Sequence, residues 1–308
     1  MKAAIRKIFH RNLATTDREE ILVITDANMR AIAGQFLDVA KELGFSVELT
    51  TIPVPKVHGV EPPAAIAGRM LSADVILIVT TKSLSHTLAR ANATQKGARI
   101  ATMAGVTEEI LQRFAQVDLP QMKARTNMIA DILDQGTQVL LTSELGTDLR
   151  FSIAGRIAHG RKASIFDQPG YWGNIPCGEA FIAPLEDSVN GRLVIDASIA
   201  GIGLVDQNAT LRIEQGKVTE IRGGSAARQF EVLLDHTTKR QVAEFGIGTN
   251  DKAQITGTTI EDEKALGTCH IAFGNNRFFG GTNAVDFHVD CVMTAPTIIV
   301  DERTIMEG

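Results

Sequence analysis

The stretch EEILVITDANMRAIAGQFLDVAKELG, residues 19–44, decides the fold class of the first half of the chain. Its opening, EEILVITD, is a short apolar run typical of a buried strand. The remainder places Ile32 and Phe36 on one helical stripe and stops at Gly44, a residue that commonly ends helices. A strand followed at once by an amphipathic helix predicts a βα unit.

The same alternation continues through the first half. Further strands are predicted in FSVELTTI, DVILIVTT and ARIATMA, and helices in PAAIAGRMLSA, HTLARANATQKG and TEEILQRFAQ. This order predicts a mostly parallel sheet covered on both faces, a Rossmann-like α/β domain over residues 1–136. The first strand leads into TDANMR, which lacks the glycines of a phosphate cradle, and no GxxxxGK[ST] motif is present, so no nucleotide site is expected.

The pattern changes after a helical segment at residues 120–136. Short apolar runs split by Gly, Asn and Asp then dominate, and EQGK joins two alternating runs as a hairpin would. One helix is predicted over residues 225–246. Residues 137–308 are therefore expected to form an α+β domain rich in antiparallel strands, which carries the functional site.

Composition limits the classes of protein. The 308 residues are 44% apolar and 22% charged, with a net charge of −5, so neither a nucleic-acid-binding nor an anionic-membrane surface is expected. No apolar run has transmembrane length, and the N-terminus lacks the pattern of a signal peptide. Three cysteines without a CxxC motif favour a reducing cytoplasm.

Ionisable residues gather in apolar, glycine-rich segments of the second half. They are Glu179, Glu244, His270, His288 and Asp290. A buried carboxylate must be paired or must bind a cation. In the strand-like run DFHVDCV the histidine and the aspartate share one face, while Val289 and Cys291 face the other. This spacing alone fits either two metal ligands or an ion pair in an ordinary strand.

Taken together, the five residues fit either a shared metal centre or separate structural roles, such as hydrogen-bonded core histidines, a loop cap at Glu179 and a helix end at Glu244. Five oxygen and nitrogen ligands suit a pair of divalent ions about 3.5–4 Å apart, which would activate a water for the hydrolysis of an amide. Two further histidines, His159 and His236, are expected to be surface or capping residues.

The segments NIPCGEAFIAPLEDSVNGRLVID, AEFGIGTN, EKALGTCHIAFGNN and HVDCVM resemble the aminopeptidase T and aminopeptidase S family of metalloaminopeptidases over residues 136–308. The resemblance implies a cytoplasmic, leucyl aminopeptidase-like hydrolase that acts on peptides and forms a homodimer. It implies two zinc, cobalt or manganese ions held by Glu179, Glu244, His270, His288 and Asp290, with the two glutamates also catalytic.

Arg277 departs from that family, which carries a tyrosine seven residues after the ligand histidine. An arginine cannot be a metal ligand because it has no acceptor atom, but it can bind a substrate carboxylate. Arg277 is therefore a third candidate catalytic residue. The chain is also shorter than typical members, so parts of the substrate cavity are expected to be missing.

A branch related to that family, the dihydroxypyridine ring-cleaving dioxygenases, uses one non-haem Fe(II) and offers a second hypothesis. They share the HxD pair and carry a histidine where this chain has Glu244. His270, His288 and Asp290 would then form the iron-binding triad of two histidines and one carboxylate, and the substrate would be a small aromatic acid. A non-catalytic relative that keeps the fold is the third hypothesis.

Overall fold

The structure is a computed structural model that describes residues 1–308. The chain divides into two compact units: Met1–Leu119 with Ser164–Cys177, and Pro120–Ala163 with Gly178–Gly308. The sequence places one boundary near residue 136, whereas the chain leaves the first unit at residue 119 and briefly returns to it. No helix in the structure combines the length and the apolar character required to span a membrane.

The first unit is an α/β unit built on a five-stranded sheet in the order β2-β1-β3-β4-β7, with every pair parallel. Its strands are β1 (Glu20–Thr25), β2 (Ser46–Thr51), β3 (Val75–Val79), β4 (Arg99–Thr102) and β7 (Trp172–Asn174). Its helices are α1 (Lys2–Lys7), the π-helix η1 (Ile8–Asn12), α2 (Arg30–Glu42), α3 (Ala64–Met70), α4 (Leu88–Gln95) and α5 (Glu108–Ala115). The return of residues 164–177 supplies β7, the edge strand that pairs with β4.

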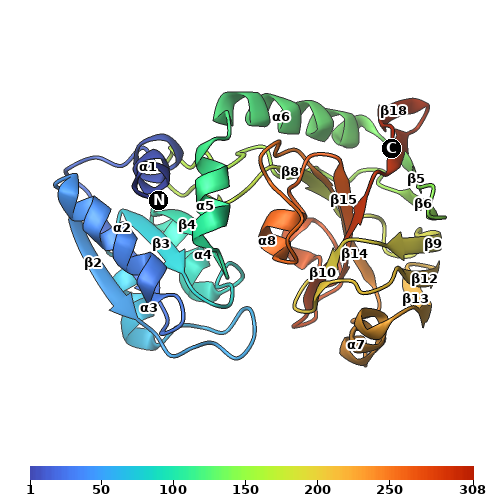
Figure 1. Ribbon diagram of the computed structural model, residues 1–308, viewed down its shortest axis with the longest axis horizontal. Helices are drawn as coiled ribbons and strands as arrows, with labels where there is room; N and C mark the ends of the chain where they lie inside the picture. Colours follow the sequence, from blue (N-terminus) through green and yellow to red (C-terminus); the bar gives the residue numbers. More distant parts are fainter. The chain divides into compact units, whose positions relative to one another are not determined.

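The second unit contains two antiparallel sheets (Figure 1). The six-stranded sheet runs β11 (Gly203–Leu204), β10 (Ser198–Ile199), β16 (His288–Thr294), β15 (Thr268–Gly274), β14 (Val242–Gly248) and β8 (Glu179–Ile182). The seven-stranded sheet runs β13 (Lys217–Arg222), β12 (Ala209–Glu214), β9 (Asn190–Ile195), β6 (Asp148–Ser152), β5 (Gln138–Thr142), β17 (Thr297–Val300) and β18 (Arg303–Met306). The helical segments are α6 (Leu119–Gln135), α7 (Ser225–Leu233), α8 (Thr259–Asp262) and η2 (Arg277–Phe279).

The two sheets of the second unit enclose one apolar core. Phe151 of β6 and Phe245 of β14 meet edge to face, with ring centroids 5.2 Å apart, and Ile247 and Ile271 belong to the same core. Because side chains alternate along a strand, the neighbours of these residues lie on the opposite face of the six-stranded sheet. The predicted fold class, an α/β unit and an antiparallel-strand-rich unit, is confirmed.

The helix predicted over residues 225–246 is wrong in its second half. Helix α7 ends at Leu233, and β14 begins at Val242. The run VAEFGIG is buried throughout and hydrogen-bonded to strands on both sides, so sheet pairing determines its conformation. Glu244 therefore lies on a central strand.

We expect Phe245→Ala to lower the free energy of unfolding by about 3–5 kcal/mol, because it empties a fully buried aromatic position. Urea unfolding followed by circular dichroism measures the change. Val232→Ala is the control, because Val232 is 75% exposed, and it should shift stability by less than about 0.5 kcal/mol. Equal effects of the two substitutions would contradict the core described here.

Candidate metal centre

The five residues singled out in the sequence lie on the same face of the six-stranded sheet, opposite the sandwich core. We call them the polar-face cluster; they are Glu179 on β8, Glu244 on β14, His270 on β15, and His288 and Asp290 on β16. The four strands are neighbours in the sheet, and their register brings these residues together. Val289, Cys291 and Cys269 belong to the apolar core, as the alternation predicts.

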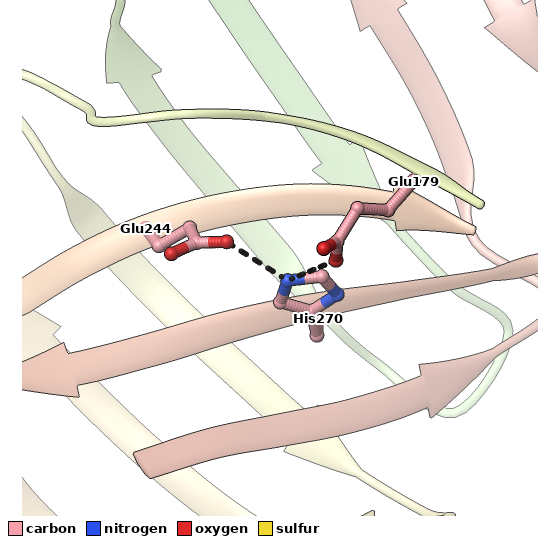
Figure 2. A group of neighbouring side chains, drawn as sticks. All are labelled: Glu179, Glu244 and His270. Carbon is pink, nitrogen blue, oxygen red and sulfur yellow. Dashed lines mark hydrogen bonds and ion pairs between the residues drawn. The ribbon is translucent and has the colours of Figure 1, made fainter. Parts of the chain in front are cut away.

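The imidazole of His270 lies between two carboxylates (Figure 2). Its Nε2 is 3.3 Å from Oε1 of Glu244 and 3.6 Å from Oε2 of Glu179, and the residue is 1% exposed. The cross-strand partner of His270 is Gly246, where an added Cβ would lie 2.1 Å from Cε1 of the imidazole. The imidazole ring of His270 therefore occupies the space that a side chain at position 246 would require.

The imidazole of His288 is oriented by the backbone. Its Nδ1 lies 2.9 Å from the carbonyl oxygen of Asn275, and because a carbonyl only accepts, Nδ1 carries the hydrogen. Its Nε2 faces Asp290 Oδ1 at 3.3 Å and Glu244 Oε2 at 3.5 Å. A histidine whose second nitrogen is held by a carbonyl is the usual arrangement of a metal ligand.

The cluster forms three sets of donors, each with ligand atoms within 4.8 Å of one another. They are Glu179–Glu244–His270, Glu244–His288–Asp290 and Glu263–His270–Asp290. Each set has one imidazole and two carboxylates. The set expected for iron, His270 with His288 and Asp290, is not among them, because Glu244 lies between the two imidazoles.

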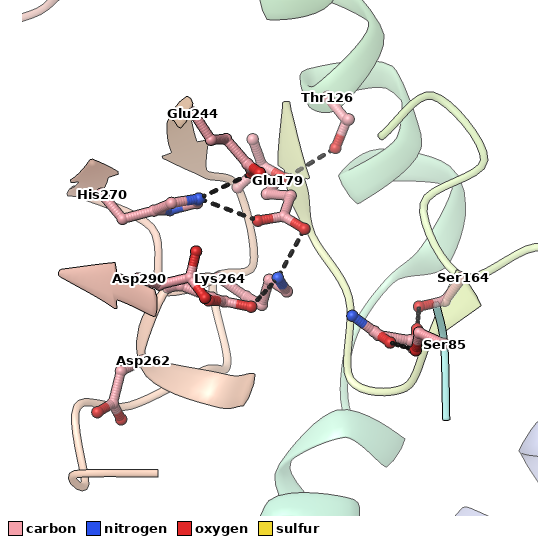
Figure 3. Close-up of polar contacts among 12 residues, drawn as sticks. Ser85, Thr126, Ser164, Glu179, Glu244, Asp262, Lys264, His270 and Asp290 are labelled. Atoms are coloured by element: carbon pink, nitrogen blue, oxygen red, sulfur yellow. Dashed lines mark hydrogen bonds and ion pairs between the residues drawn. The ribbon is translucent and has the colours of Figure 1, made fainter. Parts of the chain in front are cut away.

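Two further residues, Glu263 and Lys264, complete the cluster, and the sequence pattern does not indicate either of them. Lys264 is 1% exposed, and its Nζ donates to Oε1 of Glu179 at 2.6 Å (Figure 3). The same Nζ also pairs with Glu263. The run EDEK has the charge density of a solvated surface, so composition gives no signal of its burial. Their position just after α8 and ahead of β15 carries them under the sheet face.

His159 also lies closer to this site than the sequence indicates. Its ring stacks on Phe181, with centroids 5.3 Å apart, and Phe279 meets both His159 and His288 edge to face, at 6.3 Å and 5.9 Å. These rings form an aromatic wall beside His288. Burial lowers the pKa of His159, with the charge of Glu244 opposing the shift.

The cluster holds more carboxylates than permanently charged cations. Four carboxylates, those of Glu179, Glu244, Glu263 and Asp290, face one ammonium, that of Lys264. The pKa values of two of these acids shift in opposite directions. Burial raises the pKa of Glu263 to about 8, against the opposing effect of Lys264. Asp290 is half-buried; desolvation would raise its pKa, but the neighbouring His288 outweighs this effect and holds the pKa well below the usual range.

The imidazoles respond to the same charges. Burial alone would lower the pKa of His270, but its hydrogen bond with Glu244 and the charges of Glu179 and Glu263 raise it to about 9. Burial would likewise lower the pKa of His288, but Asp290 and Glu244 outweigh this effect and raise that pKa to about 10. A buried surplus of carboxylates is the environment that a divalent cation neutralises.

Arg277 lies outside the three donor sets. It opens η2, its side chain is exposed, and its backbone N–H donates to Oδ1 of Asn275 at 3.0 Å. The same short helix carries Phe279 of the aromatic wall.

Comparison with known proteins identifies relatives along the whole chain. A family model described as NicX, 2,5-dihydroxypyridine 5,6-dioxygenase, matches residues 7–308. A 2,5-dihydroxypyridine 5,6-dioxygenase of Pseudomonas putida KT2440 is 26% identical over 289 residues, covering 85% of this chain and 81% of the relative.

Two solved structures share the fold. The 2,5-dihydroxypyridine dioxygenase structure from Pseudomonas putida KT2440 superposes with a TM-score of 0.84 at 20% identity, covering 100% of this chain and 96% of the other. Wild-type AmpT from Thermus thermophilus superposes with a TM-score of 0.71 at 17% identity, covering 99% and 97%. At these identities the likeness concerns the fold alone.

The predicted aminopeptidase activity is wrong. The family match and the curated relative are dioxygenases, which are oxidoreductases, and not hydrolases or metalloproteases. The resemblance to the aminopeptidase T family reflects a shared fold, since AmpT appears only as a structural neighbour. The expected pair of zinc, cobalt or manganese ions has no support, although the donor sets suit metal binding.

We expect Gly246→Ala to displace the His270 ring, because the new methyl group would overlap it. Overpacking of this kind costs about 1–3 kcal/mol, and the disturbed bond to Glu244 should weaken divalent-metal affinity by about 10–100-fold. Thermal unfolding and calorimetric metal titration measure both. Gly34→Ala is the matched control, because nothing lies within 4 Å of its added Cβ; wild-type affinity in Gly246→Ala would contradict the packing.

The raised histidine pKa values predict a pH dependence of the metal-free protein. The folded-state values of about 9 for His270 and about 10 for His288 exceed the ordinary 6.5, so protonation favours the folded state. This stabilisation is complete below the ordinary value and is lost as the pH rises through the two folded-state values. Unfolding of chelator-treated protein between about pH 6 and about pH 10 should show the decline.

The control is the same series with His288→Gln, which should decline less because one of the two raised groups is absent. Saturating divalent metal should also remove much of the decline, because ligation requires deprotonated imidazoles. Identical profiles for wild-type and variant metal-free proteins would refute the assignment.

Proposed function

Because the chain belongs to the 2,5-dihydroxypyridine 5,6-dioxygenase family, we propose that it is a ring-cleaving dioxygenase of hydroxylated pyridines that uses one ferrous ion. The observation that carries the proposal is the Glu244–His288–Asp290 donor set, in which Asn275 presents the Nε2 atom of His288 to two carboxylates.

The donor set fits a ferrous ion in most respects. It is buried or half-buried, it offers three ligand atoms, and carboxylate and imidazole ligands suit divalent iron. Oε2 of Glu179, which also contacts His270, is buried without a hydrogen-bond donor, which agrees with a cluster that holds more carboxylates than permanently charged cations. The set departs from the usual triad of two histidines and one carboxylate, because Glu244 stands in for one imidazole.

The reaction balances without a further reductant. The bond between ring carbons 5 and 6 breaks, and each carbon receives one atom of the same O2 molecule, so the substrate supplies the four electrons that reduce the oxygen. When bound, a ferrous ion supplies the one-electron chemistry that lets O2 react with a closed-shell ring. The carboxylates of Glu244 and Asp290 would hold the ion, and the Asn275 carbonyl would keep the hydrogen of the neutral imidazole of His288 on Nδ1, so that Nε2 would offer its lone pair to the ion.

The aromatic wall gives a reason for an aromatic substrate. Phe279 and Phe181, with His159, present ring faces and edges beside His288, and such surfaces hold planar rings by offset or edge-to-face contact. Arg277, on the same short helix as Phe279, is proposed to bind an anionic oxygen of the substrate through its guanidinium. Both features orient a ring without taking part in ligation.

Protein loaded anaerobically with ferrous ion should consume one O2 per molecule of 2,5-dihydroxypyridine, and isotopically labelled O2 should place both atoms in the product. Asp290→Ala should lower turnover by more than the roughly 10–100-fold loss that is typical when a residue that only orients a ligand is replaced. Asp187→Ala, at an exposed acid of the same unit, should retain wild-type turnover.

Iron-loaded wild-type protein that consumes no oxygen with any hydroxylated pyridine would overturn the proposal. It would leave the non-catalytic relative as the better description of the chain.

A further inference from the structure

Lys264 is a fully buried ammonium group placed among the carboxylates of the polar-face cluster. The residue is 1% exposed, and its Nζ lies 2.6 Å from Oε1 of Glu179 (Figure 3). The same Nζ pairs with Oε1 of Glu263, so the ammonium bridges the two carboxylates. A lysine leaves water at a high cost unless carboxylates compensate its charge. The two carboxylates do so from separate segments, β8 and the segment that follows α8.

Two of the three donor sets contain a carboxylate that pairs with Lys264, and the third does not. Glu179 belongs to the set with His270 and Glu244, and Glu263 belongs to the set with His270 and Asp290. A metal ion in either of these sets would share a carboxylate with the ammonium and be repelled by it at short range. The remaining set, Glu244–His288–Asp290, contains neither of the two carboxylates that pair with Lys264, and the ammonium acts on its Asp290 only through its charge, as a minor influence behind that of His288.

We propose that Lys264 takes the place of a second metal ion, so that the cluster holds one divalent cation instead of two. The ammonium neutralises Glu179 and Glu263 from within the chain and leaves the Glu244–His288–Asp290 set as the one position for a metal. This inference rests on the proposed function in one respect, the position of the single ion. It adds the reason why a cluster with four carboxylates and two imidazoles binds one divalent ion and not two.

The charges of the cluster lead to a definite consequence. With Lys264 present, four carboxylates are opposed by one ammonium and one divalent ion. Replacement of the lysine by a neutral side chain leaves Glu179 and Glu263 without their cation, next to the imidazole of His270 that both of their donor sets share. A second divalent ion would then find both the ligands and the charge that it requires.

The test is a count of Mn2+ ions bound by chelator-treated full-length protein, because Mn2+ favours the same ligands as Fe(II) and is stable in air. Equilibrium dialysis with elemental analysis should give one ion per wild-type chain and two per chain of Lys264→Met. The electron paramagnetic resonance spectrum of the variant should show the spin coupling of two neighbouring Mn2+ ions, which wild type lacks. Lys217→Met, at an exposed lysine of the same unit, should still bind one.

A loss of stability in Lys264→Met is itself informative. If the methionine variant melts at a lower temperature, excess Mn2+ should restore its Tm by more than it raises that of wild type, because the second ion replaces the missing charge. Two ions in wild type, one ion in folded Lys264→Met, or a lowered Tm that Mn2+ does not restore would each overturn the inference.

The metal count is independent of turnover, which separates this inference from the proposed function. A chain that binds one ion as wild type and two as Lys264→Met, yet consumes no oxygen with hydroxypyridines, would refute the dioxygenase and retain the role of Lys264. An active dioxygenase that binds one ion both as wild type and as Lys264→Met would support the proposed function and refute the role of Lys264.

Discussion

Glu244 is buried between two imidazoles, and the need to compensate its charge away from water governs the polar face of the second unit. Its two carboxylate oxygens face His270 at 3.3 Å and His288 at 3.5 Å, and the residue is 6% exposed. A carboxylate in such a place requires cations around it. Imidazolium groups, the ammonium of Lys264 and a bound metal ion are the three means available to this cluster.

The sheet that carries the cluster serves two purposes because side chains alternate along its strands. On β14, β15 and β16 one set of residues enters the core between the two sheets, with Phe245 and Ile271 among them. The alternate set forms the metal centre. A core packed on one face thus fixes the positions of the ligands on the other, which is why glycine at Gly246 matters to the orientation of His270.

Periodicity predicts the parallel first unit and the antiparallel second unit, and the apolar, glycine-rich surroundings of five ionisable residues single out the polar-face cluster. Residues that depend on tertiary contacts were not predictable in this way. Lys264 stands in a charged run that resembles a solvated surface, and β7 joins its sheet after a long excursion through the second unit. The local pattern predicts a helix through Glu244, although α7 ends at Leu233. In each case contacts distant in sequence override the local pattern.

The choice between peptidase and dioxygenase could not be made from the ligand residues. The fold is shared with AmpT, and Glu244 in the sequence favours the peptidase branch, whereas the family match along residues 7–308 identifies the dioxygenases. The structure adds that Glu244 separates the two histidines, so a triad containing both is not formed. A carboxylate in this position makes the proposed iron site unusually rich in oxygen ligands.

The central claim is one ferrous ion at Glu244, His288 and Asp290. Anomalous diffraction at the iron absorption edge, from crystals loaded under anaerobic conditions, tests it most directly. The account predicts a single iron peak in contact with Nε2 of His288 and with carboxylate oxygens of Glu244 and Asp290. A peak between Glu179 and His270, or two peaks in one chain, would contradict it.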